Sequence, residues 1–254
     1  MDQSRSECDL MLMLKIVIIG DEAVGKSSIF SRYCNLSYIS ESSYDYIYIP
    51  TIGVDFRSRY ADVLTYHKLQ TKMCRCKLHI WDTSGRTALR PVTQSYYKGS
   101  HICIVCFDTT KSKPDIDVTN WITDFREKTQ LENSMIYVIG TKYDDHANLD
   151  LIDINININI NNTSFAEYIT QINDIPNTKF MGFTSAKNNT YVAFGKTDTT
   201  KVYSIHAMFM LIVKDYIEKI VYTNAIDLTQ EKYHVMSGFE NDTDNDEYCQ
   251  CCIL

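Results

Sequence analysis

Glycine, lysine and serine occur near the N-terminus at a spacing suited to holding phosphate groups. Gly20-Asp-Glu-Ala-Val-Gly-Lys-Ser27 matches the Gly-x4-Gly-Lys-Ser/Thr pattern, and it follows an apolar run and opens a segment of helical spacing. The glycines let backbone N–H groups surround the phosphates, Lys26 reaches the outer phosphates, and the Ser27 hydroxyl ligates Mg2+. The pattern predicts a nucleoside triphosphate site but leaves the base open. The predicted phosphate-binding residues are Asp21, Glu22, Ala23, Val24, Gly25, Lys26, Ser27, Thr51 and Gly85.

Two later segments carry side chains that can select the base. Thr141-Lys-Tyr-Asp144 and Ser185-Ala-Lys187 each follow an apolar run. The Asp144 carboxylate can accept from the ring N–H and the exocyclic amine of guanine, a donor pair that adenine lacks, and the Ala186 N–H can donate to the guanine carbonyl. Ligands bind at the carboxyl ends of parallel strands, so the two segments together predict guanine. The predicted guanine-binding residues here are Thr141, Lys142, Asp144, Ser185, Ala186 and Lys187.

Two further segments complete a metal and switch pattern. Pro50-Thr51-Ile-Gly-Val-Asp-Phe56 supplies the Thr51 hydroxyl to Mg2+, and Trp81-Asp-Thr-Ser-Gly85 supplies Asp82 to a Mg2+-bound water and the Gly85 N–H to the γ-phosphate. The Thr51 and Gly85 contacts require the triphosphate, so its loss releases two loops and predicts an order–disorder switch. The predicted Mg2+ set is Ser27, Thr51 and, through water, Asp82.

Strand-like and helix-like segments alternate along the chain and position these motifs. Apolar runs cover residues 14–19, 77–81, 101–107, 135–139 and 179–183, and helical spacing covers 27–34, 114–129 and 204–222. The alternation predicts an α/β fold with a mainly parallel sheet and helices on both faces. Four stretches have the composition of loop insertions or expansions: 35–49, 62–75, which would lengthen a hairpin, the Ile-Asn alternation of 151–162, and 188–203. The Ile-Asn stretch could pair as an edge strand, but a tolerated surface insertion is favoured.

Charge and cysteine content narrow the class of protein. The formal net charge of −7 over 254 residues argues against nucleic acid as a partner. Nine cysteines are an odd number in a chain too long for a disulfide scaffold, which favours a reducing, cytosolic compartment. Cys103 and Cys106 would lie on opposite faces of a strand, as buried thiols rather than a metal or redox pair. The run 10–20 contains Lys15 and follows acidic residues, so a buried first strand is favoured over a membrane span or signal peptide.

The motifs and their order resemble the Ras superfamily of small GTPases, and Ile52-Gly-Val-Asp-Phe56, Ile80-Trp-Asp-Thr83 and Tyr96-Tyr-Lys-Gly99 resemble the Rab family. The resemblance implies a P-loop NTPase fold, a mostly parallel six-stranded sheet flanked by helices, with loop insertions. It implies GTP or GDP as ligand with Mg2+, an aromatic stacked on guanine at Tyr44, and an effector-facing triad at Phe56, Trp81 and Tyr96, for which ordinary packing is an equal alternative. It also implies effector proteins, an exchange factor, a GTPase-activating protein, and prenylation escort and extraction proteins as partners. The organisation predicted is an N-terminal extension at 1–9, a GTPase domain at 10–222 and a flexible tail at 223–254.

Several residues depart from that family pattern. Arg86 and Thr87 stand where the family has the water-positioning glutamine and a glutamate, Glu22 stands where it has a small residue, and Thr141 replaces an asparagine. Arginine has no acceptor and cannot orient the attacking water as an amide does. Slow intrinsic hydrolysis is therefore favoured over a second interpretation, in which Arg86 stabilises transition-state charge while a partner positions the water.

The chain ends Cys249-Gln-Cys-Cys-Ile-Leu254, which fits the C-a-a-X prenylation form and resembles the paired-cysteine endings of Rab proteins. Because residues 240–247 are acidic and supply no basic second signal, two lipid chains on Cys251 and Cys252 are favoured over one. The resemblance to Rab proteins, together with this ending, implies a switch that recruits effectors in membrane trafficking on the cytoplasmic face of an intracellular membrane and cycles with the cytosol.

Two alternatives come from other classes. An ATP-dependent kinase or transport ATPase would share the phosphate loop but has no use for Asp144 or Ser185-Ala-Lys187. An interaction scaffold that is independent of nucleotide, or constitutively GTP-bound without GTPase activity, is favoured by Glu22 and Arg86 and opposed by the intact Lys26 and Asp82.

Overall fold

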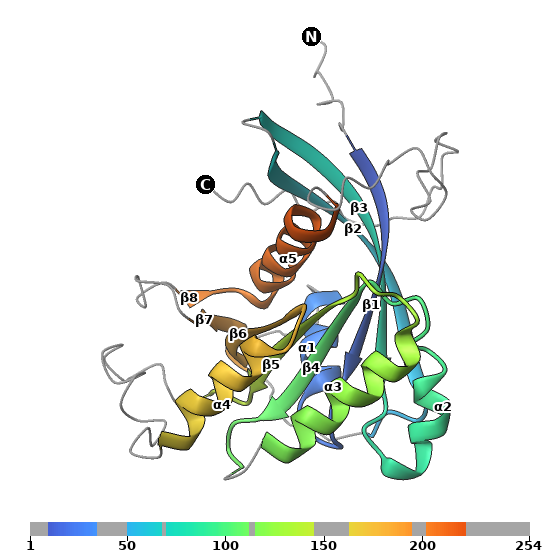
Figure 1. The fold of residues 1–254 in the computed structure, drawn as a ribbon, viewed down its shortest axis with the longest axis vertical. Helices are drawn as coiled ribbons and strands as arrows, with labels where there is room; N and C mark the ends of the chain where they lie inside the picture. The colour runs from blue at the N-terminus through green and yellow to red at the C-terminus, as the bar shows by residue number, and fades with distance from the viewer. Residues whose placement is uncertain are drawn as a thin grey trace.

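The computed structural model describes residues 10–34, 50–67, 70–111, 115–144, 163–194 and 202–221. One sheet crosses the molecule in the order β2-β3-β1-β4-β5-β6-β7-β8 (Figure 1). Its strands are β1 (Leu10–Ile19), β2 (Val54–His67), β3 (Gln70–Thr83), β4 (Ile102–Asp108), β5 (Met135–Thr141), β6 (Thr178–Ser185), β7 (Thr190–Ala193) and β8 (Val202–Tyr203). The helices are α1 (Lys26–Cys34), α2 (Arg90–Gln94), α3 (Asp115–Thr129), α4 (Thr163–Asp174) and α5 (Ile205–Tyr216), with a 3-10 turn at Thr87–Leu89 and a π-helical turn at Ile217–Val221.

The middle of the sheet is parallel. β1 pairs in parallel with β3 and β4, and the parallel pairing continues through β5 to β6. β2, β7 and β8 are added in antiparallel orientation. The predicted α/β class with a mostly parallel sheet is confirmed, and the sheet is wider than the predicted six strands. The extra strands β7 and β8 come from 188–203, the stretch predicted to be an insertion.

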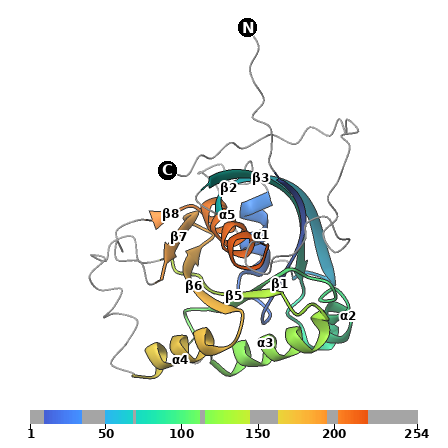
Figure 2. The same ribbon diagram turned by 45° about the horizontal axis from the view of Figure 1, so that its top comes forward.

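The helices cover the two faces of the sheet as predicted. α1 and α5 pack on the concave side, where the β2–β3–β1 part of the sheet curls around α5, whereas α3 and α4 lie on the other side (Figure 2). Two hydrophobic cores result. The first core lies on the concave face, beneath α1 and α5, and the second core lies on the other face, beneath α3 and α4. Cys106 belongs to the first core and Cys103 to the second, so the prediction that these thiols are buried on opposite faces is confirmed.

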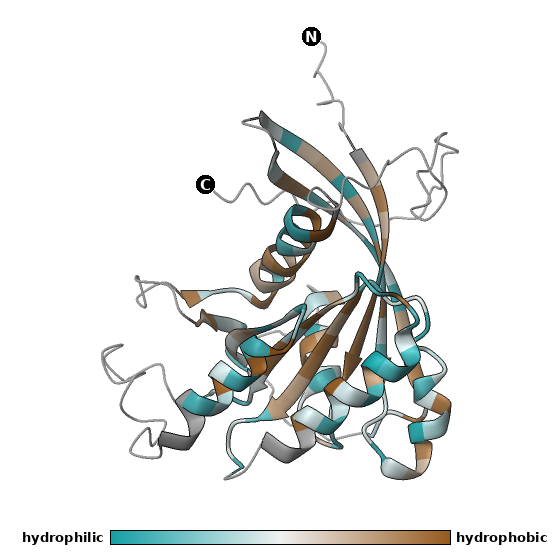
Figure 3. Cartoon of the chain, viewed as in Figure 1, coloured by the Kyte–Doolittle hydropathy of each residue, from teal (hydrophilic) through white to brown (hydrophobic). Residues whose placement is uncertain are grey.

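Hydropathy follows this layering. Apolar residues concentrate on the central strands, and the outward sides of α3 and α4 are largely polar (Figure 3). The first strand is buried, with Leu14, Ile16 and Ile18 facing α1 and α5, as predicted for the run 10–20. Within the described part of the chain, no helix has the length and apolarity needed to cross a bilayer.

The predicted lengthening of a hairpin by residues 62–75 is confirmed. β2 and β3 pair without a break in register from Val54–Thr83 at one end to His67–Gln70 at the other. At the far end, the Tyr66 N–H donates to Glu218 Oε1 at 3.2 Å, which fastens the hairpin to the turn after α5. Ala61 and Val63 face the first core, so the inner side of the extension is packed rather than solvated.

Candidate nucleotide-binding site

The phosphate loop has the backbone shape that its glycines predict. Gly20 has a φ of +139°, and a Cβ there would lie 2.3 Å from the Cys106 carbonyl oxygen, so the loop rests directly on β4. Ala23 and Gly25 also have positive φ values, 63° and 102°. The loop therefore turns sharply before α1 begins at Lys26, which leaves the N-terminus of α1 facing the cavity.

Lys26 is held inside this loop. Its Nζ donates to the carbonyl oxygens of Gly20 at 2.8 Å and Asp21 at 2.5 Å, and the residue is 5 % exposed. Burial lowers the pKa of Lys26 from its ordinary value, and nearby acidic groups that include Asp82 oppose that shift. A phosphate chain in the loop would give the ammonium a charged acceptor in place of neutral carbonyls.

The three predicted Mg2+ residues converge. Ser27 Oγ donates to Asp82 Oδ2 at 2.6 Å, and Thr51 Oγ1 lies 2.7 Å from Ser27 Oγ and 3.3 Å from Asp82 Oδ2. Burial raises the pKa of Asp82 to about 6, although hydrogen bonds from Ser27 and Thr51 and the charge of Lys26 lower it. Among the described residues, Asp82 Oδ1 has no hydrogen-bond partner. Hydroxyl and carboxylate oxygens are the ligands that Mg2+ prefers, and the unpartnered oxygen suits a metal-bound water, so the residues fit the ion.

The two base-reading segments lie side by side at the ends of β5 and β6. Ser185 Oγ donates to Asp144 Oδ1 at 2.6 Å, and the Asn188 side chain donates to the Asp144 carbonyl at 2.9 Å. From α1, Arg32 donates to the carbonyls of Ala186 and Lys187, both at 2.8 Å. No spacing pattern in the sequence points to Asn188 or Arg32, because these side chains contact backbone carbonyls from outside the motifs.

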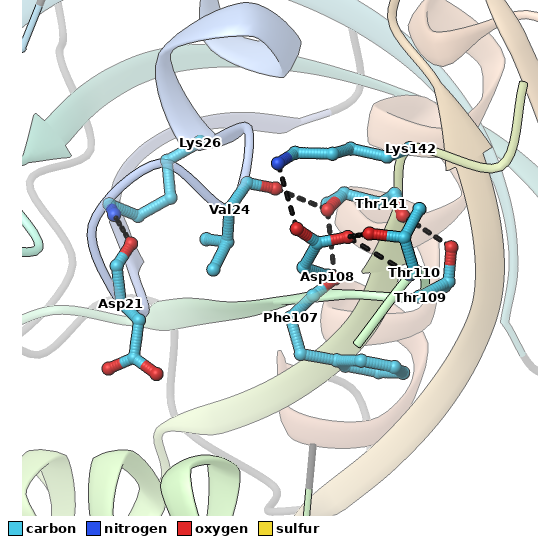
Figure 4. A network of polar contacts seen from close by, with 9 residues as sticks. All are labelled: Asp21, Val24, Lys26, Phe107, Asp108, Thr109, Thr110, Thr141 and Lys142. Atoms are coloured by element: carbon cyan, nitrogen blue, oxygen red, sulfur yellow. Dashed lines mark hydrogen bonds and ion pairs between the residues drawn. The ribbon is translucent and has the colours of Figure 1, made fainter. Parts of the chain in front are cut away.

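Thr141 and Lys142 anchor these segments instead of pointing freely into the cavity (Figure 4). Thr141 Oγ1 contacts the Val24 carbonyl and lies 2.8 Å from the Phe107 carbonyl, so it ties the phosphate loop to β4 and β5. Lys142 has a φ of 60° and its Nζ donates to Asp108 Oδ2 at 2.8 Å.

Asp108 was not predicted as a site residue. It ends β4 and is 5 % exposed, and its Oδ1 accepts from the Thr110 N–H and hydroxyl at 3.0 and 2.7 Å (Figure 4). Burial would raise its pKa, but the hydrogen bonds from Lys142 and Thr110 and the charge of Lys142 bring the pKa below its usual value. Asp108 is therefore a buried carboxylate whose ion pair with Lys142 holds that side chain in place.

Most predicted site residues line one cavity of about 460 Å³. Asp21, Val24, Asp82 and Ser185 are not on its wall. The Asp21 carboxylate instead accepts from Trp121 Nε1 of α3 at 2.9 Å, and Val24 and Ser185 are buried behind the wall. Tyr44 lies outside the described residues. The cavity is lined by Glu22, Ala23, Gly25, Lys26, Ser27, Ser28, Ile29, Pro50, Thr51, Thr83, Ser84, Gly85, Arg86, Thr141, Lys142, Asp144, Ala186 and Lys187.

Gly85 brings the segment after β3 against the phosphate loop. A Cβ at Gly85 would lie 2.2 Å from the Asp21 carbonyl carbon and 2.4 Å from the Glu22 nitrogen. Next to this contact, Arg86 Nε donates to Glu22 Oε1 at 2.9 Å. The two residues that depart most from the family pattern at the phosphate end are thus bound to each other.

The predicted effector triad forms one aromatic row. The ring centroids of Phe56 and Trp81 are 4.5 Å apart, and those of Trp81 and Tyr96 are 5.1 Å apart. Phe56 is 41 % exposed, and Lys15 Nζ lies 5.6 Å from the Trp81 ring centroid. The three rings pack against one another and leave part of Phe56 exposed. This arrangement is compatible with an effector-binding surface and with ordinary packing.

Comparison with known proteins gives the same answer as the site geometry. The family model described as Roc, the Ras of Complex domain of DAPkinase, matches residues 15–144, a stretch that begins in β1 and includes the phosphate loop and Asp144. The chain belongs to the Ras superfamily of small GTPases. Members of this superfamily generally bind GTP or GDP with Mg2+ and hydrolyse GTP. The Ser185-Ala-Lys187 segment lies beyond the matched residues.

Within the Ras superfamily, the relatives are Rab proteins. The chain is 36 % identical over 136 residues to Ras-related protein Rab-7B of Dictyostelium discoideum, covering 52 % of this chain and 59 % of the relative. It is 34 % identical over 133 residues to RabC of the same organism, covering 52 % and 61 %. It is 31 % identical over 137 residues to SEC4 of Candida albicans, covering 54 % and 58 %. The chain therefore spans about three fifths of the length of these curated relatives.

Proposed function

We propose that this small GTPase is a Rab-like molecular switch that binds GTP and GDP with Mg2+. One observation carries the proposal. Asp144, which accepts from Ser185 Oγ at 2.6 Å, lines the same cavity as Lys26 and Ser27. A carboxylate held in this way accepts from both guanine donors and would be left unpaired against adenine, which makes the site selective for guanine.

The phosphate end supports binding through charge and backbone geometry. Lys26 and the α1 N-terminus offer donors to the phosphates, and Ser27, Thr51 and Asp82 would hold Mg2+, which neutralises phosphate charge when it is bound. Thr51 precedes β2 and Gly85 follows β3, so the two segments leave the hairpin at its Val54–Thr83 end and reach the same cavity. Contacts from these segments to the terminal phosphate would order them only in the GTP state.

Slow intrinsic hydrolysis is part of the proposal. Arg86 occupies the position where the family pattern has a water-positioning glutamine, and a guanidinium can donate to phosphate but cannot accept from water. We expect long-lived GTP-bound protein unless a partner positions the water.

The Rab relationship supports a role in membrane trafficking. The Phe56–Trp81–Tyr96 row is the proposed effector surface of a GTPase domain at 10–222, and lipid on Cys251 and Cys252 in the tail at 223–254 is the proposed membrane attachment. These cysteines lie outside the described residues. The protein would cycle between cytosol and the cytoplasmic face of an intracellular membrane, with effectors, an exchange factor, a GTPase-activating protein, and prenylation escort and extraction proteins as partners.

A second candidate is a scaffold that binds partners independently of nucleotide, or stays GTP-bound without GTPase activity. The acidic Glu22 in the phosphate loop favours it, because a carboxylate beside a terminal phosphate weakens binding by repulsion.

Nucleotide content and single-turnover cleavage separate these possibilities. Guanine nucleotide is expected to copurify with the protein and to be released when the protein is denatured. GTP loaded onto the protein is expected to be cleaved slowly in the presence of Mg2+. Asp144→Asn should weaken GDP binding at least about a hundredfold, because the amide places an N–H against a guanine N–H donor. ADP should bind weakly to both forms. Protein that binds no nucleotide would favour the scaffold, and GTP cleavage as fast as in a family member with the glutamine would refute slow hydrolysis.

A further inference from the structure

The ion pair between Glu22 and Arg86 joins two segments that both line the proposed nucleotide site. Glu22 belongs to the phosphate loop before α1, and Arg86 follows β3 in the second switch segment. Arg86 Nε and Glu22 Oε1 are 2.9 Å apart, and the side chains are 44 % and 46 % exposed. Both residues line the cavity together with Lys26 and Thr51, so the pair lies within the site and is not an isolated surface contact.

The backbone fixes this pairing. Because Gly85 has no Cβ, the segment approaches so closely that an added Cβ would lie 2.4 Å from the Glu22 nitrogen. The Arg86 N–H also contacts Ser84 Oγ at 3.4 Å, a long hydrogen bond that restrains the residue weakly. The two side chains therefore start from adjoining backbones, while the Arg86 side chain can still change direction.

Once a nucleotide is bound, the Arg86 guanidinium would have two kinds of acceptor within the same cavity, the Glu22 carboxylate and the terminal phosphate. Its planar fork of N–H donors matches a carboxylate and matches a phosphate equally well in shape, but a terminal phosphate carries more charge. An ionised Glu22 carboxylate has no hydrogen-bond donor and carries negative charge, so it repels the same phosphate that attracts Arg86. Glu22 and a terminal phosphate therefore compete for one partner.

We propose that Glu22 and Arg86 form an ionic latch that senses the terminal phosphate. With GDP, no terminal phosphate competes and Arg86 stays paired with Glu22, although the Thr51 and Gly85 contacts to that phosphate are lost. With GTP, Arg86 turns to the terminal phosphate and Glu22 is released to solvent. The latch rests on the proposed nucleotide binding and adds a residue pair that sets the preference between GTP and GDP.

The competing interpretation is a fixed pair in which Arg86 only neutralises Glu22. A fixed pair stays closed with either nucleotide, whereas a latch opens with GTP alone. The two differ in the state dependence of the Arg86 Nε–H hydrogen bond, which nitrogen-15 NMR of the arginine side chain reports directly.

Affinity of the full chain for GDP and for the β,γ-imido analogue of GTP gives the first test. Glu22→Gln is expected to raise the ratio of analogue affinity to GDP affinity about three- to tenfold, since it removes the GDP-state pair and the repulsion. Arg86→Gln is expected to lower that ratio. Asp62→Asn is the matched control, because it breaks an Arg75–Asp62 pair of 2.7 Å on the hairpin away from the cavity, and it should leave the ratio unchanged.

The NMR measurement gives the second test. Glu22→Gln should shift the Arg86 Nε–H resonance in the GDP form and leave it in place in the analogue form. An affinity ratio that Glu22→Gln changes no more than Asp62→Asn, or an equal resonance shift in both forms, would overturn the latch while GDP binding stands. Absence of any guanine-nucleotide binding in the parent protein would overturn the proposed function and the latch together.

Discussion

Replacing Asp108 tests whether a residue outside the cavity controls guanine binding. In Asp108→Asn, the amide oxygen can still accept from Thr110, but an N–H faces the Lys142 ammonium, whose present partner, Oδ2, is 2.8 Å away. Lys142 then loses the contact that holds its backbone at a φ of 60°. This left-handed conformation costs an L residue about 1–2 kcal/mol.

The magnitude follows from the exposure of the two partners. A hydrogen bond to a charged group contributes about 1.5–3 kcal/mol when it is shielded from water. Asp108 is 5 % exposed, but the Lys142 side chain is 40 % exposed, so solvent screening reduces the expected contribution to about 1 kcal/mol. If the Lys142 segment is less often in its binding conformation, GDP affinity should fall about fivefold.

Titration of GDP against both proteins, together with urea unfolding, measures the effect. Asp215→Asn is the matched control: Lys179 and Asp215 form a lysine–aspartate pair of 2.7 Å, with the lysine 41 % exposed, at the opposite end of β6. The control should lower the free energy of unfolding at least as much and leave GDP affinity unchanged. If Asp108→Asn binds GDP as tightly as the parent while losing the same stability, the pair supports only the fold.

Two further predictions concern the cores that carry the site. Burial and then the charge of Lys15 lower the pKa of His101 to about 4, so the folded state binds fewer protons than the unfolded state below the ordinary pKa. The contribution of His101 to stability should therefore fall by about 2 kcal/mol from about pH 7.5 to about pH 5. In urea unfolding the parent should lose about 2 kcal/mol more over that range than His101→Asn, which keeps an acceptor for the Lys15 N–H. Thr141→Val should destabilise the protein by about 2 kcal/mol, because it leaves the buried carbonyls of Val24 and Phe107 without the hydroxyl, and unchanged unfolding in urea would contradict that role.

The central strands and long helices could be predicted because their signals are local. Strands β4 and β5 are fully buried apolar runs, and α5 repeats apolar residues at helical spacing behind Ser204, which caps it by accepting from the Ala207 N–H at 3.1 Å. Burial on both faces explains why these runs are continuous rather than alternating.

The edges of the sheet could not be predicted in the same way. β7 has four residues and β8 has two, too few for a periodicity to be recognised. Their formation depends on tertiary contacts, such as the buried Tyr191 hydroxyl that donates to the Met181 carbonyl at 2.9 Å. α2 has five residues with Pro91 at its start, so it too lacks a helical repeat.

Among the site residues, too, those in local motifs could be predicted and those that act over long sequence distances could not. The residues predicted to contact the nucleotide fall in compact motifs, whereas the residues that hydrogen-bond to them come from distant strands and helices. Asp108 and Arg32 act through pairs separated by 34 and 154 positions in the sequence. The pairing of Glu22 with Arg86 likewise joins two positions that the sequence marked separately as unusual.

The central place of α5 also has a consequence for how the protein is made. α5 is the last described helix, yet Met208, Phe209 and Ile212 are fully buried in the first core, where the curled sheet surrounds them. While the ribosome is still translating residues before Ile205, the concave side of β1 and β3 has only α1 to cover it. That core therefore cannot be completed until α5 has left the ribosome, and until then the nascent chain will expose apolar strand residues for which chaperones have affinity.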